Sequence, residues 1–339
     1  MSTLLAFFSR FARKLPALFL CLFLLSAAVF ALARSAPGDP LQAFYGDAVE
    51  RMSAAEHAAA RRRLGLDAPL YRQYAGWLAG AARGDFGLSL KYKRPAAEVL
   101  PPLLVNTLLL AALSYALIFF LAVLLAGLCA LHEGSRFDRL LCRAGALACY
   151  TPSFWLGLLL LLVFSVKLGW LPGGGAYEPG KAADALGRLR HLALPVATLT
   201  LGHFWYYGHM IRSRLLDEAR QDYVLLARAK GLSRSRVVFG HCLRAAAPFV
   251  VNLMAVAAAH LIGGAYVVEA VFSYPGLGAL AIESAKYHDY NLLLLVTLLT
   301  GAAVLCTAFA AQSLAEALDP RLKAQEASAW EMPTTRLHS

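Results

Sequence analysis

Six long apolar runs alternate with polar segments along the chain. They cover residues 15–33, 103–131, 144–166, 192–211, 245–271 and 291–314. Each is close to the roughly 20 residues that a helix needs to cross a bilayer. The second run contains no charged residue at all. The pattern therefore predicts an all-α integral membrane protein with six transmembrane helices.

The first run follows a short basic segment, residues 1–14. Ala31-Leu32-Ala33 at its end resembles a signal-peptidase site, so a cleaved signal peptide is the alternative to a first span. The run is longer than the usual apolar region of a signal peptide, about 7–15 residues, which favours an uncleaved span.

A polar segment of 69 residues, 34–102, separates the first two runs. Within it, residues 61–70 and 73–78 are expected to form short helices joined by a turn, and residues 84–89 a loop. We therefore expect four parts: the N-terminus and first span (1–33), an external domain (34–102), a membrane core (103–318) and a tail (319–339).

Composition supports the membrane assignment. Hydrophobic residues make up 59% of the chain and charged residues only 16%, against about 25% in soluble domains. The net charge of +11 would suit nucleic acid or anionic lipid, and the long apolar runs favour lipid over nucleic acid. The six cysteines form no CxxC pair, so neither a zinc site nor a disulfide framework is indicated.

The polar stretch 212–244 lies between two apolar runs and holds eight Lys/Arg. Apolar residues recur at helical spacing from Leu216 onward, which predicts an amphipathic helix over 217–230. Gly231 is expected to end it, and Ser233 to cap a second helix. A basic loop between spans would explain the arginines alone, whereas a surface that docks another protein also explains the apolar stripe.

The distribution of Lys and Arg predicts the orientation. With six spans, the side that carries both termini and the 212–244 loop has 17 Lys/Arg, and the short loops of the other side have five. Positive charge is retained in the cytoplasm, so both termini and this loop are expected there.

The motifs of this loop resemble the coupling loop of bacterial ABC-transporter permeases of the dipeptide/oligopeptide/nickel importer family. The resemblance assigns contact with the ATPase to Asp222, Tyr223, Ala227, Arg228, Ala229, Lys230, Gly231 and Leu232. Pro37-Gly38-Asp39-Pro40 and the turn 272–278, preceded by Glu269, are further similarities. Leu225 stands where the general pattern has glutamate, and residues 312–317 depart from the family pattern.

The resemblance implies an ABC importer type I permease fold in the bacterial inner membrane. It also implies two cytoplasmic ATP-binding subunits, a second homologous but non-identical permease subunit, and an extracytoplasmic solute-binding protein. No cofactor is expected. Peptides, nickel, metal chelates and glutathione conjugates are all solutes of this branch, and the sequence leaves the choice among them open.

The apolar runs contain almost no charge, which indicates that energy reaches them from a partner. His203, Tyr206, Tyr207, His209 and Glu269 are candidates to line a passage for solute. His203 and His209 are six residues apart, about 240° around a helix, so no metal site is expected.

Residues 175–181 have the glycine and lysine spacing of a phosphate-binding loop. The following residue, Ala182, cannot hold magnesium as Ser or Thr would, and no apolar strand precedes the loop. ATP hydrolysis is therefore expected on separate subunits.

Two other functions are alternatives for a protein with such spans. A secondary carrier or channel would show inverted repeats or spans broken at mid-membrane, and neither is clear. An intramembrane enzyme would need a nucleophile and a base inside the spans, and no Gly-x-Ser-x-Gly, His-Glu-x-x-His or paired membrane aspartates appear.

Overall fold

The computed structural model describes residues 2–35, 40–181 and 183–318. The regular structure in this part of the chain consists of helices, joined by turns and loops, with one isolated bridge between Leu88 and Pro95. The elements are α1 (Ser2–Ser35), α2 (Pro40–Tyr45), η1 (Gly46–Arg51), α3 (Ala54–Arg63), α4 (Leu70–Ala81), α5 (Ala96–Leu131), α6 (Arg136–Tyr150), α7 (Ser153–Leu160), η2 (Leu161–Lys167), α8 (Ala185–Ala219), α9 (Asp222–Ala229), η3 (Arg236–Cys242), α10 (Leu243–Val271), α11 (Leu277–Lys286) and α12 (Tyr290–Leu318). The all-α prediction is confirmed.

Four of the described helices are long and apolar enough to cross a membrane: Phe7–Ser35, Ala96–Leu131, Arg236–Ala258 and Tyr290–Ser313. A fifth span is possible if α6 and the α7–η2 segment are counted as one bent span. α8 is long enough but is not among these candidates, because its histidines, tyrosines and tryptophan lower its hydropathy. The count of six spans therefore stays a prediction.

The predicted third span, 144–166, is not one straight helix. α6 and the segment Ser153–Lys167 meet at an angle of 103°. The cause is Pro152, which disfavours helical geometry in the residue before it. Thr151 is accordingly extended, with φ −77° and ψ 129°.

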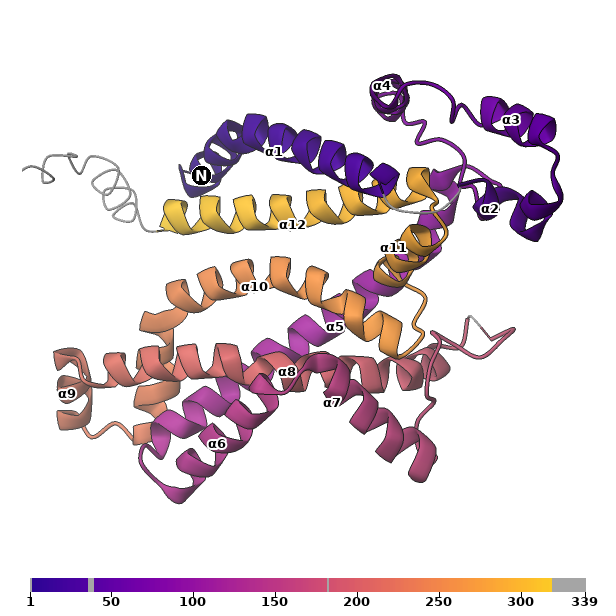
Figure 1. Ribbon diagram of the computed structural model, residues 1–339. Coiled ribbons are helices and arrows are strands. Elements are labelled where there is room, and N and C mark those ends of the chain that lie inside the picture. Colours follow the sequence, from indigo (N-terminus) through magenta and orange to yellow (C-terminus); the bar gives the residue numbers. More distant parts are fainter. Residues whose placement is uncertain (1, 36–39, 182, 319–339) are drawn as a thin grey trace, which may run out of the picture.

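The long helices pack side by side (Figure 1). α1 lies along α12, α12 along α10, and α5 along α8, with α6 also packed on α8. One end of the molecule holds the start of α1, the end of α12, and α9. The opposite end holds α2–α4 and α11.

The segment 34–102, which was expected to be external, matches its predicted helices only in part. The helix expected over 61–70 ends at Arg63, and residues 64–68 form a turn in which Gly65 has φ +68°. The helix expected over 73–78 lies within the longer α4, and residues 84–89 are non-helical as expected.

Small residues allow α8 to approach its neighbours closely, as is usual for packed membrane helices. Ala122 and Ala126 of α5 are fully buried in the cluster that also holds Tyr207 of α8. On α6, a Cβ at Gly145 would lie 2.2 Å from the ring of Trp205, so only glycine fits there. α8 is thus packed between α5 and α6, and its C-terminal end positions α9.

Candidate functional site

The polar stretch between α8 and α10 folds differently from the expected helix over 217–230. α8 continues to Ala219, the chain turns at Arg220 and Gln221, and α9 begins at Asp222. The regular spacing of apolar residues from 216 to 230 therefore combines two helices, and the prediction of one continuous helix was wrong. Gln221 is extended (ψ 153°), which redirects the chain so that α9 packs against η3.

α9 has an inner and an outer face. Val224 and Ala227, three residues apart, are buried in the core between α5, α8 and α10. The outer face carries Leu225 and Leu226, 61% and 58% exposed, beside the exposed Arg228. A short helix that presents two leucines and a cation to solvent is a surface suited to another protein.

Gly231 ends α9 as expected. Its φ is +78°, in the left-handed region. Its N–H donates to the Arg228 carbonyl (2.9 Å), and the Leu232 N–H donates to the Ala227 carbonyl (3.2 Å). These two bonds form a Schellman motif, which satisfies carbonyls at the end of the helix.

Hydrogen bonds fix α9 to α8. The Tyr223 hydroxyl donates to the Glu218 carboxylate (2.8 Å), and Arg214 pairs with the same carboxylate (2.7 Å). Partial burial, together with the hydrogen bond to Glu218, raises the pKa of Tyr223. Tyr223 therefore remains a neutral donor, and a displacement of α9 would pull on the end of α8.

A buried ion pair fixes α6 to α8 nearby. Arg212 donates to both oxygens of Asp138, at 2.9 and 2.7 Å, and the Gly134 N–H adds a third bond of 3.0 Å. Burial alone would raise the pKa of Asp138, but the bonds from Arg212 and Gly134 outweigh it and lower the pKa to about 2. The pair is charged at any physiological pH.

Four of the five candidate pathway residues lie on α8, on different sides of it. Tyr206 and His209 are exposed, His203 is half-buried, and Tyr207 is buried against the Phe119 ring at 5.1 Å between centroids. The His203 ring bonds the Leu199 carbonyl of its own helix at 2.9 Å. Tyr206 and His209, three residues apart, form the accessible part of this group.

Glu269 lies apart from the α8 group and is wholly buried. It accepts hydrogen bonds from the Thr107 hydroxyl (2.6 Å) and from the Gly278 and Ala279 N–H groups (2.7 and 3.2 Å). A carboxylate suits the first turn of α11, whose free N–H groups point toward it. Glu269 thus joins α5, α10 and α11, and its side chain has no contact with solvent.

Sequence reasoning missed the roles of Val224, Leu225 and Glu218. Val224 and Ala227 would have been identified by applying helical spacing to 222–229 alone. Within the described ranges no three His, Cys, Asp or Glu side chains gather as a metal site.

Comparison with known families gives two matches that together cover most of the chain. A family described as "Binding-protein-dependent transport system inner membrane component" matches residues 120–324. The N-terminal family of the same transport-system membrane components matches residues 5–91. The first match includes α9, and the second includes residues 34–91 of the polar segment between the first two apolar runs.

Individual relatives are similar over nearly their whole length. The oligopeptide transport system permease protein AppB of Bacillus subtilis is 34% identical over 87% of this chain and 92% of its own. The di/tripeptide transport system permease protein DppB of Pseudomonas aeruginosa is 35% identical over 93% and 98%. The glutathione transport system permease protein GsiC of Escherichia coli is 35% identical over 92% and 97%.

Proposed function

The chain belongs to the family of binding-protein-dependent transport-system inner-membrane components. From this membership we propose how it is coupled to ATPase subunits, how it is oriented in the membrane and which solute it carries. It is a multi-pass permease subunit of an ABC importer in the inner membrane, and not an enzyme. ATP-binding and solute-binding partners belong to such a system.

We assign contact with two cytoplasmic ATPase subunits to α9. The observation that carries this proposal is the pair of exposed leucines, Leu225 and Leu226, on a helix whose other face is anchored in the core. Asp222, Tyr223 and the segment Ala227–Leu232 complete the coupling segment. Tyr223, through Glu218, would transmit a movement of α9 to α8.

The proposed transport cycle is a population shift. ATP would draw the two ATPases together, and α9 would follow them. Because α9 bonds to the end of α8, the helices would tilt from inward-open to outward-open, and hydrolysis would reset them. A ligand that binds one of two states more tightly shifts their populations in this way.

The solute passage is proposed to run along the accessible side of α8, with Tyr206 and His209 facing it and His203 at its edge. Tyr207 and Glu269 are assigned to packing, because both side chains are buried. A second, similar but non-identical permease subunit would supply the other wall. With six spans, α8 being one, both termini and α9 would be cytoplasmic and α2–α4 would face the solute-binding protein.

The proposed solute is a peptide. Relatives of comparable similarity are named for oligopeptides, for di- and tripeptides, and for glutathione, which is itself a modified tripeptide. Labelled-peptide uptake by the complete transporter tests the solute class. Uptake that requires no ATP would favour a carrier and contradict the proposal.

Co-purification tests the assignment of α9. Leu225→Asn should reduce capture of the ATPase by about tenfold or more, because a buried leucine contributes roughly 1.5–3 kcal/mol. Leu186→Asn is the matched control, since Leu186 is 70% exposed and lies at the start of α8, far from α9. Equal capture by both variants would show that α9 does not hold the ATPase.

A further inference from the structure

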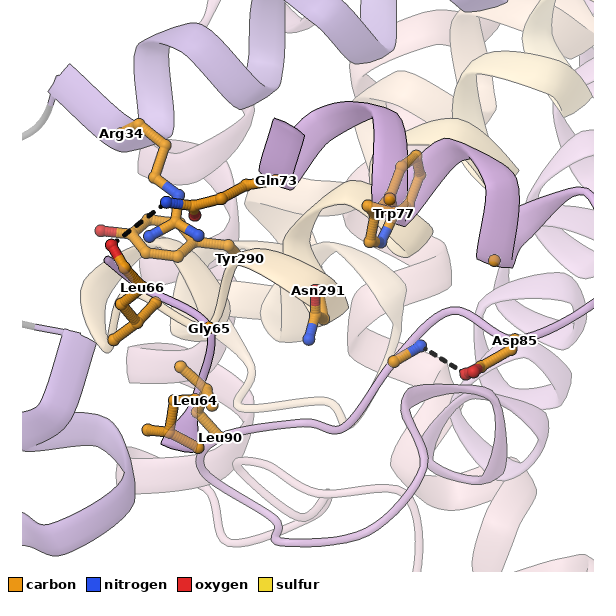
Figure 2. Close-up of a pocket in the computed structure, with 13 residues that line it drawn as sticks. Arg34, Leu64, Gly65, Leu66, Gln73, Trp77, Asp85, Leu90, Tyr290 and Asn291 are labelled. Atoms are coloured by element: carbon orange, nitrogen blue, oxygen red, sulfur yellow. Dashed lines mark hydrogen bonds between the residues drawn. The ribbon is translucent and has the colours of Figure 1, made fainter. Parts of the chain in front are cut away.

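A second candidate site lies at the end of the molecule opposite α9. It is a cavity of about 250 Å³ between the end of α1, the α3–α4 region, the loop after α4 and the start of α12. Arg34, Gln73, Trp77, Asp85 and Tyr290 are among its lining residues (Figure 2). The cavity is smaller than the roughly 300–1,000 Å³ of drug-sized sites, so it suits a small solute.

Three buried polar atoms of this cavity have no hydrogen-bond partner: Arg34 Nε, Gln73 Oε1 and Trp77 Nε1. Eight such unpaired atoms are found among the described residues, and three of the eight lie in this one cavity. Trp77 is only 9% exposed. Buried polar groups are nearly always bonded, so unmade bonds that converge on a cavity point to something that fills it.

The unpaired atoms are of two kinds. Arg34 Nε and the Trp77 indole can only donate. Gln73 Oε1 can only accept, and its orientation is fixed because Gln73 Nε2 donates to the Leu66 and Ala68 carbonyls at 3.1 and 2.6 Å. A ligand that pairs with all three atoms therefore offers both acceptors and donors.

The cavity also has a positively charged and a negatively charged lining residue, Arg34 and Asp85. In Figure 2, Arg34 and Asp85 lie on opposite sides of the cavity, with Trp77 and Asn291 between them. The Arg34 guanidinium lies over the Tyr290 ring at 4.1 Å, which holds the cation in place. Asp85 uses one oxygen to accept the Gly87 N–H at 2.9 Å.

Gly76 is a lining residue of the cavity with room for a side chain. Gly76 stands inside α4, where glycine weakens a helix. At Gly80, one turn further, a Cβ would meet the Asp85 carbonyl oxygen at 2.8 Å, which explains that glycine. At Gly76, which is exposed and lines the cavity, no heavy atom lies within 4 Å of such a Cβ, so a side chain there would extend into open space beside the cavity.

We infer that this cavity binds a small zwitterionic dipeptide, with its carboxylate toward Arg34 and Trp77. Its ammonium group lies toward Asp85, and the peptide N–H, which is close to the carboxylate, bonds Gln73. Acetate would supply acceptors only, and inorganic phosphate would bring no positive charge to Asp85. An ammonium ion would supply donors only and no anion for Arg34. The inference does not depend on the transported solute, because the site is separate from α8 and α9.

The test reads Trp77 itself. The full-length chain is labelled with 5-fluorotryptophan in lipid nanodiscs, and Trp77→Phe identifies the Trp77 fluorine resonance among those of the five tryptophans. Alanyl-alanine should shift this resonance saturably, whereas acetate and inorganic phosphate should not. No shift with alanyl-alanine, or an equal shift with phosphate, would overturn the inference.

Variants locate the ligand. Arg34→Gln should weaken alanyl-alanine binding about 10- to 100-fold, because it removes a charged donor. Arg72→Gln is the matched control: Arg72 also lies over a tyrosine ring, at 5.8 Å from its centroid, but is exposed and does not line the cavity. Equal affinity in the two variants would contradict the site.

Filling the cavity gives an independent check. Gly76→Leu should abolish the alanyl-alanine shift. Gly76→Ala, which favours the helix, should weaken binding while raising or keeping the unfolding midpoint. Unchanged affinity in a folded Gly76→Ala and an unchanged shift in Gly76→Leu would show that the ligand does not occupy this space.

Discussion

The Thr107 hydroxyl joins three helices, and its removal is the sharpest test of the packing described here. It donates to Glu269 of α10 (2.6 Å) and accepts from the Leu277 N–H at the start of α11 (2.8 Å). Thr107 itself belongs to α5 and is 3% exposed. Thr107→Val keeps the shape of the side chain and removes both bonds.

The cost can be worked from these contacts. A buried N–H left without an acceptor costs about 1–3 kcal/mol, and a bond to a charged group contributes about 1.5–3 kcal/mol. Together they give about 2.5–6 kcal/mol. With an unfolding entropy of roughly 2.1 cal/mol/K per residue, the midpoint of a chain of this length should fall by about 4–8 °C.

Thr198→Val is the matched control. Thr198 is also fully buried, but its hydroxyl donates only to the Leu194 carbonyl of its own helix, at 2.9 Å. That carbonyl keeps its backbone partner, so the expected cost is below about 1 kcal/mol. The assay is thermal unfolding of both variants in the same detergent. Equal midpoints for the two variants would refute the argument that Thr107 holds α5, α10 and α11 together.

Two further predictions concern the end of the molecule that holds α9. The folded pKa of Asp138, about 2, lies below its ordinary 3.8, so the Asp138–Arg212 pair stabilises the fold above pH 3.8 and loses about 2 kcal/mol as pH falls toward 2. The measurement is the unfolding midpoint as a function of pH. In Asp138→Asn the midpoint should fall less steeply below pH 3.8 than in the unmodified protein, and an equally steep fall would exclude the ion pair as its cause. Gly231→Ala should cost about 1–2 kcal/mol in backbone strain and reduce ATPase capture several-fold. Gly84→Ala, also at positive φ with free space around it, should cost similar stability and leave capture unchanged; a loss of capture in both would point to general unfolding.

Local signals in the sequence determined much of this protein. The apolar runs predicted a helical membrane protein, and Gly231 predicted the end of α9, because hydrophobic length and a left-handed glycine are properties of neighbouring residues. The motifs of residues 222–233 predicted the family. The prediction was less accurate where a break depends on packing: residues 216–230 look continuous, yet Val224 and Ala227 reach the core only because the chain turns at Arg220.

Contacts between distant residues were decided by the tertiary structure alone. Thr107 meets Glu269, 162 positions away, and this contact buries a carboxylate that the sequence suggested for the passage. Arg34, Trp77 and Tyr290 come from three separate segments, and nothing in their local sequence shows that they share a cavity. The physical reason is that helical periodicity and capping depend on residues within a few positions. Partners across the fold are chosen by how whole helices pack.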